Sequence, residues 1–171
     1  MTLKLRGLIP DARDPIGGMI NDSSNREILE RYVALFESLS LENVTDLAEL
    51  CREDVLFKDP FNHIQGAAAF VGVMRQALED LHEPRFHVSD VAFSEKAEEN
   101  RLCYLRWTMT FRFRPSGSEK RIEGMSELHF AADGRVQSHI DHWDAARQFY
   151  EDLPMLGALI RLVRRRLTFK G

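Results

Sequence analysis

The segment 136–143 carries the densest group of side chains that could move a proton. Its alternating pattern predicts a β-strand, in which His139, Asp141 and Trp143 share one face, because alternate residues of a strand point to the same side. A carboxylate two residues from an imidazole on one face could form an acid–base pair. The alternative is that the two groups only satisfy each other within the core.

A second candidate base is Asp59, which precedes Pro60 at the end of a short predicted strand. Three apolar side chains lie near it in the sequence pattern, Leu56, Phe61 and Phe70. An apolar wall would disfavour the charged carboxylate and so make it a stronger base. The alternative is an Asp-Pro turn in which the carboxylate binds the backbone of its own loop.

Tyr32 is the third candidate. It lies on the apolar stripe of a predicted helix, together with Leu29, Val33 and Phe36 at helical spacing. A buried phenol usually finds a hydrogen-bond partner. Tyr32 therefore either faces a pocket or is a core tyrosine bonded to a neighbouring group.

The pattern offers little for metal or redox chemistry. A metal site would need a third ligand beside the imidazole–carboxylate pair, and although His63 and His87 are available, no spacing in the sequence requires one. The cysteines, Cys51 and Cys103, form no C-x-x-C pair, and Cys103 has the surroundings of a buried free thiol. We expect no metal ion and no cofactor.

Composition is typical of a single globular domain. The chain has 171 residues, of which 44% are hydrophobic, and a formal net charge of −4. This charge gives no general attraction to nucleic acid. The sequence contains no run of about 18 apolar residues, the length needed to span a membrane. The first residues lack the apolar core of a signal peptide. We therefore expect a cytoplasmic protein.

The elements that must position these residues change from helical to strand periodicity after Pro84. Helical spacing is found first, at residues 24–39, 42–51 and 67–81, with one short strand at 55–57. Period-two alternation follows at 86–93, 102–114, 121–130 and 136–143. This order predicts an α+β domain with three helices on the concave face of a strongly curved, antiparallel or mixed sheet. We expect an N-terminal arm at 1–22, the domain at 23–153 and a basic amphipathic helix at 154–171.

A bent sheet under three helices leaves a conical, mostly apolar pocket. The predicted lining comes from the inward faces of the helices and strands, with Ser126 as a placed polar group. The ligand-contacting residues that we predict are Phe36, Leu56, Phe61, Phe70, Met74, Trp107, Met109, Phe111, Ser126, Leu128 and Trp143. Their chemistry predicts a small apolar ligand.

Four short motifs and their spacing resemble the ketosteroid isomerase pattern. They are Arg31-Tyr32-Val33-Ala34-Leu35, Glu53-Asp54-Val55, Lys58-Asp59-Pro60 and a Gly66 that opens a helix. The resemblance extends over residues 26–150 and includes the alternating strands. It implies the nuclear-transport-factor-2-like superfamily, a cone-shaped, cystatin-like fold that includes steroid isomerases, SnoaL-like polyketide cyclases, epoxide hydrolases and binding proteins. Fold alone does not choose among these functions.

The resemblance also implies roles for single residues. Asp59 matches the general base of the isomerases, and Tyr32 matches their oxyanion donor. Ser126 stands where they have a protonated Asp. Asp141 matches the acid–base residue on the last strand of the polyketide cyclases. The epoxide-hydrolase pattern fits less well, because Trp107 stands where those enzymes have an Arg.

Two surfaces could bind partners. The segment 154–171 is apolar on one side and basic on the other; it could touch an anionic membrane, but we expect its apolar stripe to pack on the domain, as amphipathic helices normally do. The outer face of the sheet, which includes Arg106, Thr108 and Arg112, could form a homodimer or remain solvated.

These features favour a pocket protein for a small apolar molecule. One hypothesis is a cofactor-free isomerase or cyclase in which Asp59 moves a proton, Tyr32 stabilises an oxyanion, and Asp141 with His139 assists. The alternatives are a binding module without turnover, or a protein-interaction scaffold whose pocket is filled by its own side chains.

Overall fold

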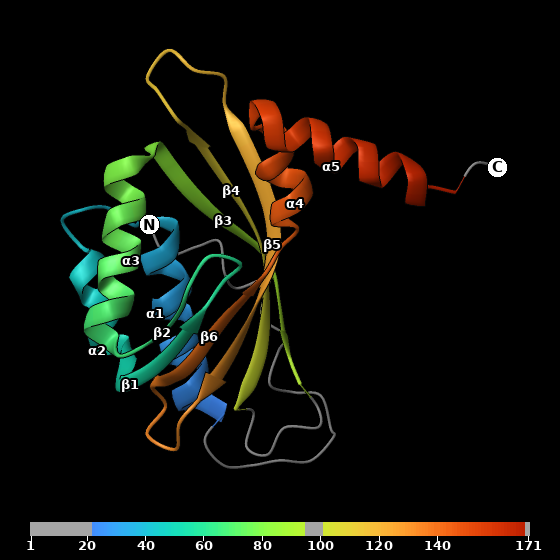
Figure 1. The fold of residues 1–171 in the computed structure, drawn as a ribbon. Helices are drawn as coiled ribbons and strands as arrows, with labels where there is room; N and C mark the ends of the chain where they lie inside the picture. The colour runs from blue at the N-terminus through green and yellow to red at the C-terminus, as the bar shows by residue number, and fades with distance from the viewer. Residues whose placement is uncertain (1–21, 95–100, 170–171) are drawn as a thin grey trace.

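The structure, a computed structural model, describes residues 22–94 and 101–169 (Figure 1). The predicted arm, residues 1–22, lies outside this part except for its last residue. The described residues form a six-stranded curved sheet in the order β2-β1-β6-β5-β4-β3. Its strands are β1 (Cys51–Lys58), β2 (His63–Gln65), β3 (His82–Phe93), β4 (Leu102–Arg112), β5 (Lys120–Phe130) and β6 (Val136–His142).

The sheet is mixed. The last four strands form an antiparallel meander, as the alternating segments predicted. β1 instead runs parallel to β6 and antiparallel to the short β2. Within β4, Leu105, Trp107, Met109 and Phe111 are buried while Arg106 is exposed. The predicted α+β class with a curved mixed sheet is therefore confirmed.

Three helical segments precede the meander: α1 (Asp22–Glu37), the short α2 (Leu47–Leu50) and α3 (Ala67–Asp80). Figure 1 shows them on the same side of the sheet, and α1 and α3 contact β3. α1 packs through the stripe Leu29, Tyr32, Val33 and Phe36, whose spacing gives a helix one apolar face.

The chain from Val44 to Lys58 differs from the prediction. A helix over 42–51 was expected, but only a 3-10 turn at Val44–Asp46 and the four residues of α2 form. The backbone is already extended at Cys51, with φ −107° and ψ 157°, because Cys51 pairs with Val136 of β6. Parallel pairing with a distant strand has therefore overridden the local helical spacing, and β1 begins four residues earlier than expected.

Both cysteines are unpaired and buried in the core, as predicted for Cys103. Burial raises the pKa of the Cys51 thiol to about 12, because the thiolate is poorly solvated there. These thiols are therefore protonated at neutral pH.

The C-terminal part begins at α4 (Ala145–Gln148), which is capped by Asp144 as expected: its carboxylate accepts a hydrogen bond of 3.0 Å from the Arg147 backbone N–H. A 3-10 turn, η4 (Tyr150–Asp152), leads into α5 (Pro154–Leu167). Figure 1 shows α5 extending away from the domain. The expectation that its apolar stripe packs on the domain was wrong, since those side chains are exposed. Among the described residues, no helix is both long and apolar enough to cross a membrane.

Candidate functional site

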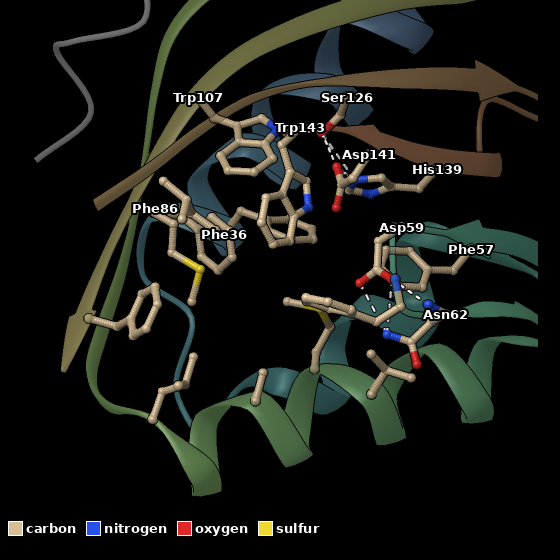
Figure 2. A pocket seen from close by; sticks show the side chains of 18 of the residues that line it. Phe36, Phe57, Asp59, Asn62, Phe86, Trp107, Ser126, His139, Asp141 and Trp143 are labelled. Carbon is tan, nitrogen blue, oxygen red and sulfur yellow. Dashed lines mark hydrogen bonds and ion pairs between the residues drawn. The ribbon is translucent and has the colours of Figure 1, made fainter. Parts of the chain in front are cut away.

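A cavity of about 510 Å³ lies between the concave face of the sheet and the helices. This is within the usual range for small-molecule sites, about 300–1,000 Å³. Most of its wall is apolar, and one cluster of polar groups stands out, where Figure 2 shows Asp141, His139 and Ser126 across from Asp59 and Asn62. The filled pocket that the scaffold alternative required is not present, because Trp107, Met109, Phe111 and Trp143 line the space without closing it.

At this end, three of the predicted residues are connected by hydrogen bonds. The Tyr32 hydroxyl lies 2.6 Å from His139 Nδ1, and His139 Nε2 lies 2.8 Å from Asp141 Oδ1. Tyr32 and His139 are buried, whereas the Asp141 side chain is 17% exposed. The chain of bonds therefore runs from the core to the cavity surface and ends on a carboxylate.

Ser126 extends this network to Trp107. The Trp107 indole N–H donates to Ser126 Oγ at 2.8 Å, and the Ser126 hydroxyl donates to Asp141 Oδ1 at 2.5 Å. Ser126 Oγ also lies 3.1 Å from His139 Nε2. We refer to Tyr32, Trp107, Ser126, His139 and Asp141 as the buried network.

Strand register brings these residues together. Ser126 of β5 pairs with Asp141 of β6, and on its other side with Leu105 of β4. Trp107 of β4 pairs with Gly124. A Cβ atom at Gly124 would lie 2.5 Å from the Trp107 ring, so the absence of a side chain there allows the indole to lie across β5. The indole N–H then reaches Ser126.

One arrangement of protons accounts for the hydrogen bonds from Tyr32 through His139 to Asp141. Tyr32 donates to Nδ1 of a neutral His139, whose Nε2–H donates to Asp141, since a neutral imidazole has one donor and one acceptor. Burial holds the pKa of Tyr32 well above its usual value of 10, and Cys51 and Asp141 nearby raise it further. Tyr32 is therefore a neutral donor at physiological pH.

The two oxygens of Asp141 differ in their surroundings. Oδ1 accepts from both Ser126 and His139. Within residues 22–94 and 101–169, Oδ2 has no hydrogen-bond partner, and Asp141 lines the cavity. A carboxylate fixed by one oxygen and free at the other can accept a proton from a bound molecule.

Asp59 is held differently. It follows β1 directly, and its Oδ1 accepts hydrogen bonds from the backbone N–H groups of Phe61 at 2.7 Å and Asn62 at 2.5 Å. The Asn62 side-chain amide lies 3.1 Å from both Asp59 oxygens. The turn hydrogen-bonding expected for an Asp-Pro sequence is therefore present, although Asp59 also lines the cavity and is half-buried.

Most of the predicted lining residues border the cavity. They are Phe36, Phe61, Met74, Trp107, Met109, Phe111, Ser126 and Trp143, in addition to Tyr32, Asp59, His139 and Asp141. No ligand is present to test their predicted roles.

Three predicted residues do not reach the cavity. Leu56 alternates to the other side of β1 from Phe57, so Phe57 lines the space in its place. Phe70 is fully buried and stacks on Phe57 with ring centroids 4.4 Å apart. Leu128 pairs with His139 and is fully enclosed in the core. For Phe70 and Leu128, the predicted face was correct, but the face does not show how deeply a side chain is buried.

An aromatic rim consists of Phe61 and Trp143, which were predicted to line the cavity, and of Phe113 and Phe149, which sequence reasoning missed. The ring of Phe61 lies 5.3 Å from those of Trp143 and Phe149, and Phe113 lies 5.8 Å from Phe149. Phe113 continues the alternation of β4 and could have been included. Phe149 follows α4, and no local pattern indicates that this segment returns to the cavity.

The described residues include no group of three or more His, Cys, Asp or Glu side chains arranged to hold a metal ion. Among them, the polar residues that line the cavity are those of the buried network, Asp59 and Asn62 of the turn, and Gln76 and Asp80 of α3. This set can bind the polar end of an apolar molecule and exchange a proton with it.

Solved structures of other proteins share this fold. A search of the curated proteins found no match. An NTF2-like protein of unknown function from Exiguobacterium is 19% identical with a TM-score of 0.59, over 68% of this chain and 98% of its own. SalBIII, an epoxide hydrolase/cyclase-like enzyme of pyran ring formation in salinomycin, is 14% identical with a TM-score of 0.60, over 73% and 95%.

A protein with a ketosteroid isomerase-like fold from Catenulispora acidiphila is 10% identical with a TM-score of 0.60, over 71% of this chain and 88% of its own. These identities establish a shared fold. The family model of the SnoaL-like domain matches residues 29–139, which include α2, α3, most of α1 and most of the sheet. The chain thus belongs to the SnoaL-like domain family, within the nuclear-transport-factor-2-like superfamily.

Proposed function

We propose that this protein binds a small, largely apolar carbonyl compound and isomerises or cyclises it by proton transfer, without a cofactor. The observation that carries this proposal is the Asp141 carboxylate, which the buried network holds by Oδ1 and leaves free at Oδ2 beside an apolar cavity. An apolar site with one fixed base suits removal of a proton from carbon. The SnoaL-like family and the cyclase-like neighbour SalBIII support the reaction class.

In this proposal Asp141 is the general base. Its Oδ2 takes a proton from the carbon next to the carbonyl, and the electrons of that C–H bond form an enolate. An isomerase then returns the proton to a different carbon. A cyclase instead lets the enolate carbon attack a second electrophilic carbon of the same molecule, whose oxygen is then protonated.

The enolate oxygen needs a hydrogen-bond donor. Tyr32 was expected to supply it, but its hydroxyl already donates to His139 Nδ1 in the proton arrangement described above. Trp143 lines the cavity on the same face of β6 as Asp141, and its indole N–H has no partner within the described part of the chain. We therefore assign the donor role to Trp143, and to Tyr32 the role of a positioning residue behind His139.

Asp59 then has a secondary role. Its oxygens are occupied by the turn that it forms with Phe61 and Asn62, so a proton transfer to it would weaken these bonds. The Asp59 turn places a polar surface opposite Asp141 across the polar end of the cavity. We therefore propose that the Asp59 turn orients a polar group of the ligand and does not make the first proton transfer.

The proposal is tested with a series of cyclic β,γ-unsaturated ketones of increasing size, in deuterated water. We expect wild type to catalyse isomerisation or deuterium exchange, and Asp141→Asn to lower kcat/KM by about 10²–10⁴-fold, the usual contribution of a general base. Asp54→Asn is the matched control, because Asp54 is exposed on β1 and, among the described residues, forms an ion pair only with Arg52.

The alternative is a binding module of the same fold. It is favoured by the fact that each side chain of the buried network already has a partner, so the network is complete without a substrate. Quenching of tryptophan fluorescence measures ketone binding directly, because Trp107 and Trp143 line the cavity. Saturable binding without any proton exchange by wild type would reject the enzyme and retain the binding module.

A further inference from the structure

The helix α5 has an apolar stripe that nothing in the described structure covers. It consists of Met155, Leu159, Leu162, Val163 and Leu167, which are between 51% and 86% exposed. Their spacing along the helix places them on one side. An amphipathic helix normally buries such a stripe, so this exposure requires an explanation.

The opposite side of α5 is the one that contacts the domain. Arg161 donates to the Glu151 backbone carbonyl at 2.6 Å, and Arg164 lies 3.2 Å from the Glu151 carboxylate. Gly157 fits closely there, since a Cβ atom would lie 2.1 Å from the same carbonyl. These three residues follow one another at helical spacing, about half a turn from the apolar stripe. Glu151 of η4 therefore holds α5 by its polar side, and the apolar stripe faces outward.

Charge indicates what covers the stripe. Residues 154–171 contain five basic residues and no acidic ones, whereas the preceding part has 18 basic and all 27 acidic residues, a formal charge of −9. Arg165 and Arg166 are exposed and form no ion pair within the described residues. The helix is thus a strongly basic segment on an acidic protein, which favours a partner with a negative surface.

Pairing with α5 of a second copy fits poorly. Two such helices would bring like charges together, and Arg166 projects within the arc of the apolar stripe, so it would be buried between them. A bilayer accepts both features, because a long arginine side chain can extend from the acyl region to the headgroups. At about 1.5 Å per residue, the 14 residues of α5 span roughly 21 Å, less than the roughly 30 Å hydrocarbon core.

We propose that α5 lies on the surface of membranes that contain anionic lipids, with its apolar stripe inserted among the acyl chains and its arginines at the headgroups. α5 begins four residues after Tyr150, whose ring lies 5.9 Å from Phe61 of the aromatic rim. Docking therefore brings the mouth of the cavity near the membrane surface. The inference does not depend on the chemistry proposed for Asp141.

The test is co-sedimentation of the full chain with vesicles of phosphatidylcholine, with and without phosphatidylglycerol. We expect binding to the anionic vesicles at low salt and roughly twentyfold weaker binding to phosphatidylcholine alone, because each arginine near an anionic surface contributes about fivefold. Added salt should release the protein. Arg165→Gln with Arg166→Gln should weaken binding to the anionic vesicles by the same roughly twentyfold factor.

A second pair of variants tests the apolar stripe. Leu159→Glu should abolish binding, whereas Leu41→Glu, at a leucine that is 48% exposed in the domain, should bind as wild type does. Circular dichroism confirms that both variants fold. The proposal is overturned if wild type fails to bind anionic vesicles at low salt, binds both vesicle types equally, or is unaffected by Leu159→Glu. It is also overturned if wild type forms a lipid-free dimer that Leu159→Glu dissociates, since a second copy would then cover the stripe.

Discussion

Two carboxylates face the same cavity but are held by different parts of the molecule. Asp59 is bound by its own loop, through Phe61 and Asn62, two and three residues away. Asp141 is bound by the buried network, in which Ser126 lies 15 residues away and Tyr32 joins from α1 through His139. A local turn engages both oxygens of its carboxylate, whereas a tertiary network fixes one oxygen and leaves the other available.

The same contrast separates the structural role of the Asp59 turn from the catalytic role that we propose for Asp141. The Asp59 turn orders a loop at the edge of the cavity and uses the carboxylate to do so. The buried network costs more to assemble, because Tyr32, His139 and Ser126 are almost completely removed from water and must find all their partners inside the protein. Such a network is a strong means of orienting one carboxylate toward a ligand.

The largest expected effect comes from replacing each of the two aspartates with asparagine in a separate variant. Relative to wild type, Asp59→Asn should lower kcat/KM for the ketone assay by less than about tenfold, while Asp141→Asn lowers it by about 10²–10⁴-fold. Asparagine can still form the turn at position 59 but cannot act as a base at position 141. Steady-state kinetics of the two variants side by side measure the ratio. A larger loss at Asp59 would move the general base to the turn.

A smaller effect is expected when one partner of each carboxylate is removed. Ser126→Ala should lower the free energy of unfolding by about 1–3 kcal/mol, because the buried Trp107 N–H loses its acceptor. Asn62→Ala should cost only about 0.5–1 kcal/mol, the usual net value of an accessible hydrogen bond. Urea denaturation of both variants provides the comparison. Equal losses would indicate that the buried network is no more tightly coupled to the fold than the turn.

The smallest expected effect is a change in the free energy of unfolding at alkaline pH. The pKa of Tyr32 is raised above 10 in the folded protein, so its contribution to stability is fully present below pH 10. Above pH 10 the unfolded chain releases this proton while the folded protein keeps it, and the contribution is lost at up to about 1.4 kcal/mol per pH unit.

Tyr32→Phe has no such proton. Its deficit in free energy of unfolding, about 1–2 kcal/mol at pH 9 from the lost hydrogen bond to His139, should therefore narrow between pH 10 and pH 11. Urea titrations of wild type and variant at these values test this, with Cys51 and Cys103 kept protonated by burial in the folded protein. A deficit that stays constant with pH would show that Tyr32 titrates normally.

The amino-acid sequence by itself determined the elements that depend on local periodicity. The alternation of Leu105, Trp107, Met109 and Phe111 predicted β4 and its buried face, and the stripe around Tyr32 predicted α1. The Asp-Pro pair indicated the turn at Asp59 as the alternative to a base, because a carboxylate there can bind groups within three residues of itself. Each of these is a property of a short segment, which periodicity and turn chemistry describe well.

Tertiary structure alone decided the depth and the connections of the site. The extension of β1 to Cys51 depended on parallel pairing with β6, and the exclusion of Phe70 and Leu128 from the cavity depended on how far the helices cover the sheet. The bonds from Tyr32 and Trp107 toward Asp141 depended on strand register and on the space left by Gly124. Register, depth and close approach are relations between segments far apart in the chain, and no local pattern specifies them.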